Sequence, residues 1–251
     1  MKQFITNRPI VFAIGISLFD LVLGLLIFII GSALGLSEQT LEWVALSVIT
    51  ALPLILIGWI GWWRDAGFVS TTQNNYALAG PLALALIFLA WFGTVEVPPG
   101  LIFQLYLAFF LTALSEEALS RGLLLRALLP SGKWYAVLIP SVLFGLGHIT
   151  HFLFIGMPFS ENVLQIMNAT LFGFLFAGVR LQVNSIWPLI ILHMLFDTFA
   201  GLTGVFGIPE DRGIGSIPVS LWGTMWILAA CLGTYFVLRP GTATIDGKPV
   251  G

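Results

Sequence analysis

The run IVFAIGISLFDLVLGLLIFIIGSAL, residues 10–34, carries one ionisable side chain, that of Asp20. A helix needs about 20 mostly apolar residues to cross the hydrocarbon core of a bilayer. The apolar core of a cleaved signal peptide is shorter, at about 7–15 residues, and a polar mature domain follows it. Here further apolar segments follow instead. We therefore expect residues 10–34 to form a first membrane-spanning helix.

The rest of the chain repeats this pattern of long apolar segments separated by short polar breaks. The length rule predicts about eight spanning helices, at residues 10–34, 41–63, 76–95, 101–129, 134–150, 163–182, 185–204 and 217–238. Helix-stopping prolines such as Pro98 and Pro130 lie in or beside the breaks. The sequence contains no internal repeat and no linker between domains. We expect an all-α, polytopic integral membrane protein with a single domain over residues 1–251.

Composition supports the same class of protein. Hydrophobic residues make up 58% of the chain and charged residues only 9%, whereas about 25% of an average soluble domain is charged. The mean hydropathy is +1.01. The net charge is −2, and no basic stretch is interleaved with aromatic residues, so we expect membrane lipid and no nucleic acid among the partners.

Charge placement predicts the orientation in the membrane. With the spans above, only Arg212 among the basic residues falls on the side opposite the termini, where several acidic residues also lie. Basic residues concentrate on the cytoplasmic side of membrane proteins, so both termini are expected in the cytoplasm. Short loops and the lack of a targeting sequence favour a prokaryotic inner membrane. The basic residues on the side of the termini are Lys2, Arg8, Arg64, Arg126, Lys133, Arg180, Arg239 and Lys248.

Ionisable residues inside three predicted spans stand out, because such groups are costly in lipid and usually functional. They lie in SEEALSR (115–121), FGLGH (144–148) and HMLFD (193–197). The helical rise of about 1.5 Å per residue places Glu116, His148, His193 and Asp197 in or near the middle third of the bilayer core. Four polar groups at similar depth predict one shared cavity.

Helical spacing separates the expected roles within these segments. Glu117 and Arg121 lie four residues apart with the acid first, which favours a structural ion pair on one helix face. Glu116 points about 100° away from Glu117 and has no local cation opposite it, so it is free to act as a general base. Taken singly, His148 or His193 could instead form a helix–helix hydrogen bond. His151 could face water near a helix end, and we assign no chemistry to Asp20.

Together, the patterns EExxxR at 116–121, FxxxH at 144–148 and HxxxD at 193–197 resemble the three signature motifs of a known family. This is the CAAX-processing and bacteriocin-processing (CPBP, or Abi) family of intramembrane proteases, which includes the type II CAAX prenyl endopeptidases. The approach NSIWP at 184–188 is also similar to family members. The resemblance covers about 105–200, which we expect to be the catalytic core.

The resemblance implies hydrolysis of a peptide bond in an apolar or prenylated protein or peptide substrate. Glu116 is then the general base and His148 helps to hold the attacking water, while His193 and Asp197 line the oxyanion region. Glu117 and Arg121 are the supporting pair, and Phe144 packs beneath His148. An ionised Asp197 cannot donate a hydrogen bond to an oxyanion, so we expect it to orient His193 by accepting its other N–H.

Two alternatives stay open at the level of sequence. Glu116, His148 and His193 are of types that bind zinc, but the HExxH zinc helix is absent, so we favour a metal-free mechanism without a cofactor. The second alternative is a transporter in which the Glu, His and Asp side chains form a proton relay. Transporters often contain paired broken helices in corresponding halves, and the sequence has no such symmetry.

Overall fold

The computed structural model describes residues 2–69, 99–202, 219–241, 244–245 and 248–249. These ranges are almost entirely helical, so the prediction of a polytopic helical membrane protein is confirmed. Beyond the helices they contain one short antiparallel pairing, between β1 (Thr244–Ile245) and β2 (Lys248–Pro249). The main helices are α1 (Lys2–Asn7), α2 (Pro9–Ala33), α3 (Glu38–Ile60), α5 (Pro99–Glu117), α6 (Leu125–Leu128), α7 (Lys133–Gly147), α8 (Phe159–Arg180), α9 (Trp187–Leu202) and α10 (Val219–Leu238).

Within the described ranges, five helical stretches are long and apolar enough to cross a membrane. Two shorter apolar helices accompany them, at Trp187–Thr198 and Thr224–Leu238. The predicted span 76–95 lies outside the described residues, so the count of about eight stays a prediction. The five stretches are Pro9–Ala33, Glu38–Ile60, Gly100–Ser131, Lys133–Phe154 and Phe159–Arg180.

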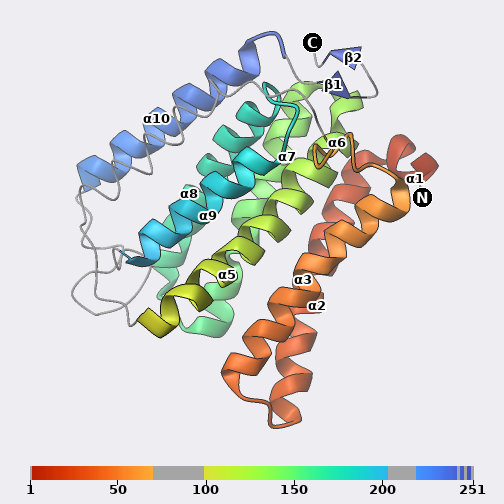
Figure 1. The fold of residues 1–251 in the computed structure, drawn as a ribbon. Coiled ribbons are helices and arrows are strands. Elements are labelled where there is room, and N and C mark those ends of the chain that lie inside the picture. The colour runs from red at the N-terminus through yellow and green to blue at the C-terminus, as the bar shows by residue number, and fades with distance from the viewer. Residues whose placement is uncertain (1, 70–98, 203–218, 242–243, 246–247, 250–251) are drawn as a thin grey trace.

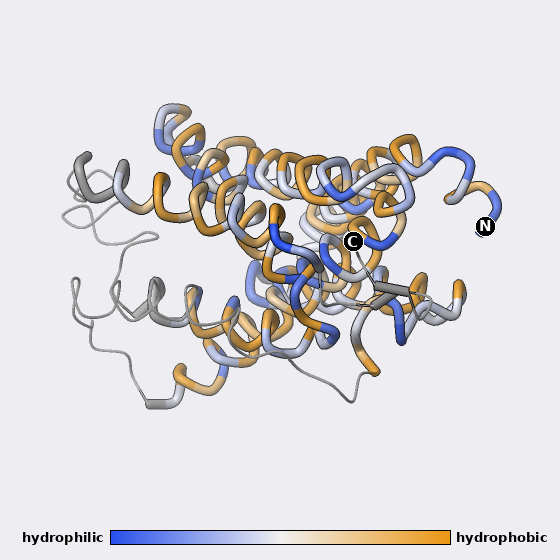
Figure 2. The backbone as a smooth tube through the Cα atoms, turned by 90° about the horizontal axis from the view of Figure 1, so that it is seen from above, coloured by the Kyte–Doolittle hydropathy of each residue, from blue (hydrophilic) through white to orange (hydrophobic). Residues whose placement is uncertain are grey.

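The outer surface of the bundle is apolar, as lipid contact requires. Large hydrophobic side chains are exposed along the helices, including Ile29 on α2, Trp59 on α3 and Phe103 on α5. Figure 2 shows hydrophobic residues along most of the helix lengths. In Figure 1, α1 and the end of α10 lie toward the same end of the bundle, opposite the turn between α2 and α3. The side that faces the cytoplasm stays a prediction.

The core is built from pairs of helices packed side by side. Helix α5 packs against α3 and α9, while α8 packs against α7 and α10. Ala113 and Leu114 of α5 form a small buried cluster with Ile186 and Ile190, which holds α5 against the start of α9. This contact brings the second half of α5 alongside α9, and therefore brings two of the three sequence motifs together.

The segment after α3 fixes the entry into α9 through buried hydrogen bonds. Arg180 is only 2% exposed, and its Nη1 donates to the Val183 carbonyl at 2.6 Å while Nη2 donates to the Asp65 carbonyl at 3.0 Å. The Ile186 amide donates to the Gly67 carbonyl at 3.0 Å. Gly67 has φ +88°, and a Cβ there would lie 2.9 Å from the Asn184 carbonyl oxygen, so glycine is needed for this close approach.

Helices α7 and α8 lie in close contact at Gly145, which makes this position sensitive to a single methyl group. A Cβ on Gly145 would lie 2.7 Å from the Ile166 carbonyl oxygen and would also overlap the Thr170 hydroxyl. We expect Gly145→Ala to lower the free energy of unfolding by about 1–3 kcal/mol, since overpacking forces the helices apart. Unfolding in mixed micelles titrated with sodium dodecyl sulfate measures this change.

Gly147 on the same helix provides the matched control. A Cβ there would meet no atom within 4 Å, so Gly147→Ala should leave the stability unchanged or raise it slightly through helix propensity. Equal stability of the two alanine variants would contradict the close α7–α8 contact.

Candidate active site

Glu116 and Glu117 lie at the end of α5, where the helix changes its hydrogen-bonding pattern. The next seven residues form a π-helical segment, η2 (Ala118–Leu124). Such segments are rare and often occur at functional sites. Arg121 lies within η2, and the ion pair with Glu117 forms across the junction, with Arg121 Nη1 2.9 Å from Glu117 Oε1.

Glu117 is completely buried and connects two of the motifs. Its Oε1 also accepts a hydrogen bond from His193 Nδ1 on α9, at 2.8 Å. An ionised carboxylate can only accept hydrogen bonds, so Nδ1 carries a proton. His193 is therefore oriented by donating its short hydrogen bond to Glu117, whereas Asp197 is the expected acceptor.

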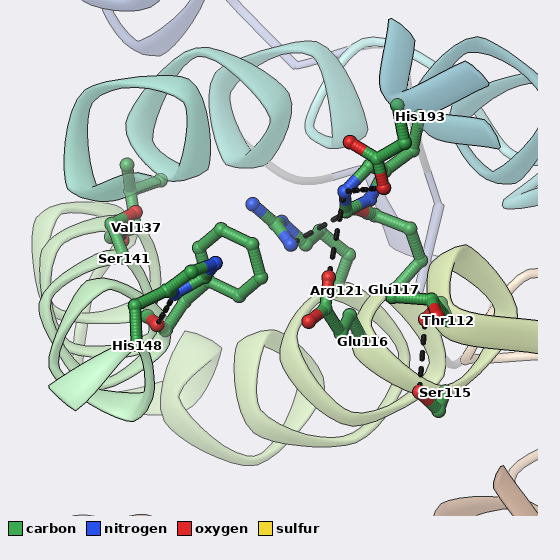
Figure 3. A network of polar contacts seen from close by, with 11 residues as sticks. Thr112, Ser115, Glu116, Glu117, Arg121, Val137, Ser141, His148 and His193 are labelled. Atoms are coloured by element: carbon green, nitrogen blue, oxygen red, sulfur yellow. Dashed lines mark hydrogen bonds and ion pairs between the residues drawn. The ribbon is translucent and has the colours of Figure 1, made fainter. Parts of the chain in front are cut away.

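The other ring nitrogen of His193 faces two carboxylates. Its Nε2 lies 3.4 Å from Glu116 Oε2 and 3.5 Å from Asp197 Oδ2. The side chain of Glu116 is 30% exposed, compared with 0% for that of Glu117. Figure 3 shows His193 beside both glutamates. With Nδ1–H given to Glu117, Nε2 can donate a hydrogen bond only when the ring carries both protons.

His148 approaches this group from α7. Its Nδ1 lies 3.1 Å from the Phe144 carbonyl oxygen one turn earlier. A carbonyl can only accept, so Nδ1 donates and the neutral ring keeps an acceptor lone pair on Nε2. The Phe144 ring packs edge-on against both His148 and His193, with centroids 5.2 and 6.1 Å away. Phe144 therefore lies between the two histidines.

Arg121 reaches the site between two aromatic rings. Its guanidinium carbon lies 4.8 Å from the centroid of Phe144 and 5.7 Å from that of Phe176. Cation–π contact and the ion pair with Glu117 together compensate the burial of this charge. A Cβ on Gly173 would lie 3.3 Å from Arg121 Nη2, so α8 leaves space for the guanidinium at this position.

These side chains border one cavity of about 320 Å³. Glu116, His148, His193 and Asp197 all line it, so the structure brings the four predicted catalytic residues to one cavity. Asp20 on α2 does not line it, and its Oδ1 is buried without a hydrogen-bond partner among the described residues. The remaining lining residues are Phe109, Thr112, Arg121, Phe144, His151, Gln165, Asn168, Ala169, Phe172, Phe176 and Phe196.

Sequence reasoning missed the contribution of α8 to this cavity. Gln165, Asn168, Phe172 and Phe176 recur every three or four residues and place one face of α8 on the cavity. The spacing is present in the sequence, but none of these side chains is ionisable, so the cost of a charge in lipid gives no signal at these positions. His151, which we expected could face water, is half-buried and lines the same cavity.

The zinc alternative depends on how Glu116, His148 and His193 are arranged around the cavity. Within the described ranges, no group of three or more His, Cys, Asp or Glu side chains is arranged to hold an ion. Glu116, His148 and His193, the set expected for a zinc-dependent variant, are therefore not grouped in this way in the described structure. Nε2 of His193 instead contacts Glu116 and Asp197 directly.

Comparison with known proteins adds one match. The family described as type II CAAX prenyl endopeptidase Rce1-like matches residues 98–199. The match shows that this segment, about two fifths of the chain, is similar to the CAAX protease family. The matched segment contains all three motifs and every residue of the predicted site. No curated protein and no solved structure matches the chain.

The CAAX protease family is a family of membrane-embedded peptide hydrolases. Together with the long apolar helices, this similarity supports an integral membrane protein.

Proposed function

We propose that this protein is an intramembrane endopeptidase that uses Glu116 and His148 to activate a water molecule. The observation that carries the proposal is the contrast between the two adjacent glutamates. Glu117 is buried and paired with Arg121, whereas Glu116 reaches the cavity and pairs with no Lys or Arg among the described residues. A carboxylate in this position is suited to general base catalysis.

Each group has a role in the proposed hydrolysis. The water donates one hydrogen bond to Glu116 and one to the lone pair on His148 Nε2. As its oxygen bonds to the scissile carbonyl carbon, Glu116 takes a proton and later delivers it to the leaving amine, so that the C–N bond breaks. His193 carrying both protons donates Nε2–H to the developing oxyanion, while Glu117 holds its ring in place.

We infer that the substrate is an apolar or lipid-modified peptide segment. Several phenylalanines line the cavity, including Phe109, Phe172 and Phe176, and the surrounding helix surface is suited to lipid. Purified protein in detergent should cleave at least one member of a panel of apolar and prenylated C-terminal peptides, measured by mass spectrometry. If no peptide is cleaved while the protein conducts protons in liposomes, the relay alternative replaces this proposal.

The proposal needs no metal ion, which gives a direct prediction. The carboxylate and imidazole groups provide the base and the oxyanion donor, so 1,10-phenanthroline or EDTA should leave kcat/KM unchanged within about twofold. Preparations with and without added zinc should also cleave the peptide equally. Loss of cleavage on chelation, with recovery on adding zinc, would contradict the metal-free mechanism and leave the protease class intact.

A further inference from the structure

A second polar group lies in the cavity beside the proposed catalytic residues. It consists of His151, at the start of the π-helical segment η4 (His151–Ile155), and of Gln165 and Asn168 on α8. The proposed cleavage gives these residues no role. Polar side chains in a largely aromatic cavity are expected to have partners, so the atoms that they leave unpaired indicate what binds there.

A chain of hydrogen bonds fixes the proton of His151. Asn162 Nδ2 donates to Gln165 Oε1 at 3.3 Å and to the His148 carbonyl at 2.8 Å. The amide of Gln165 is thereby oriented with Nε2 toward His151 Nδ1, at 2.7 Å. An amide nitrogen only donates, so Nδ1 accepts and the neutral ring carries its proton on Nε2. Among the described residues, His151 Nε2 has no hydrogen-bond partner.

His148 and His151 therefore present opposite hydrogen-bonding groups to the cavity at Nε2. Nε2 of His148 is an acceptor because its Nδ1 donates to the Phe144 carbonyl. Nε2 of His151 is a donor, and the two ring centroids lie 5.6 Å apart. His148 is thus suited to bind a water proton, whereas His151 is suited to bind an oxygen of the substrate.

Asn168 adds a second donor of the same kind. It is buried, and its Oδ1 accepts a hydrogen bond from Trp226 Nε1 on α10. This contact leaves the two N–H groups of the amide for the cavity that Asn168 lines. Both donors are neutral, which favours a carbonyl oxygen over a charged group as the partner.

We propose that His151 and Asn168 form a subsite that binds a main-chain carbonyl oxygen of the substrate. This inference rests on the proposed function, since it places the peptide relative to the attacking water on His148. An extended chain advances about 3.3 Å per residue, so the 5.6 Å between the rings corresponds to one or two residues from the scissile bond. Asn162 and Gln165 are positioning residues that keep the donor on Nε2 of His151.

Steady-state kinetics on the best-cleaved peptide of the panel tests the subsite. We expect His151→Phe, which removes the donor, to raise KM about 2–10-fold, the loss of affinity that corresponds to one neutral hydrogen bond. Its kcat should stay within about twofold of the wild type. His151→Gln keeps an N–H donor and should restore most of the affinity. Gln165→Leu should raise KM in the same way, and the double variant should show no further increase. Thr150→Ala beside the subsite serves as the matched control.

Peptides that lack one carbonyl identify the contact itself. In each, a single amide flanking the scissile bond is replaced by a reduced CH2–NH unit. We expect one replacement to raise KM for the wild type but to have no effect on KM in His151→Phe. The subsite proposal is overturned if every replacement raises KM by the same factor in both proteins. It is also overturned if KM of His151→Phe equals that of the wild type.

A binding measurement separates this inference from the proposed function. The probe is a panel peptide with its scissile amide reduced, which binds without being cleaved, and tryptophan fluorescence reports binding. Weaker binding to His151→Phe than to Thr150→Ala supports the subsite even if the wild type cleaves no peptide. Equal binding to the two variants overturns it even if cleavage and its dependence on Glu116 are established.

Discussion

Glu116→Gln should abolish most of the peptide cleavage while leaving the protein folded. Glutamine retains the shape of the side chain but cannot accept the proton of the attacking water. Positioned general bases contribute about 10²–10⁴-fold to rate, so we expect kcat to fall by about that factor. KM should change little, because Glu116 contacts the water rather than the body of the substrate. Single-turnover cleavage of the best panel peptide provides the measurement.

Glu38→Gln is the matched control for this substitution. Glu38 is an exposed glutamate in the first turn of α3 and does not line the cavity, so this variant should retain full activity. Glu116→Gln should also unfold with close to the stability of the wild type, since the side chain is 30% exposed and glutamine keeps an acceptor oxygen for His193 Nε2. Full activity in Glu116→Gln would exclude this residue as the base.

Glu117→Ala should destabilise the protein far more than Glu116→Ala. Its carboxylate is completely buried and accepts from both Arg121 and His193. Removing one partner of a buried pair leaves the other charge uncompensated, at a cost of about 3–5 kcal/mol. We expect this loss in the free energy of unfolding, measured in mixed micelles titrated with sodium dodecyl sulfate. Activity should fall as well, because His193 loses the hydrogen bond that orients it.

A double variant separates the two consequences of losing Glu117. Glu117→Leu combined with Arg121→Met removes the stranded charge and fills the space with apolar atoms, a change that is often neutral for stability. We expect the double variant to be more stable than Glu117→Ala and still poorly active. If restored stability also restored activity, Glu117 would have only a structural role and the hydrogen bond to His193 would not matter for catalysis.

The sequence predicted the architecture of the site better than its detailed contacts. Apolar run lengths indicated the helices, because lipid requires about 20 apolar residues in each spanning segment. Helical spacing indicated the Glu117–Arg121 pair, and the depth estimate placed Glu116, His148, His193 and Asp197 together. These inferences depend on the rise and the periodicity of a single helix, which the sequence determines directly.

Contacts between different helices were harder to predict. Asp197 is the expected acceptor for an N–H of His193, but the short hydrogen bond runs from His193 Nδ1 to Glu117 on α5. The packing of Ala113 and Leu114 against Ile190 sets the rotation of α5 relative to α9, and no local pattern reports that rotation. The cavity-lining face of α8 was missed for a similar reason, since Gln165 and Asn168 acquire significance only when His151 and Trp226 lie opposite them.

Incorporation of oxygen-18 tests whether Glu116 activates the water that cleaves the peptide bond. The best panel peptide is incubated in ¹⁸O-labelled water with the wild type, with Glu116→Gln and with Glu38→Gln, and the products are weighed by mass spectrometry. We expect one new carboxyl terminus carrying ¹⁸O from the wild type and from Glu38→Gln, with almost none from Glu116→Gln. Equal labelled product from Glu116→Gln, or no product from any peptide with the wild type, would contradict it.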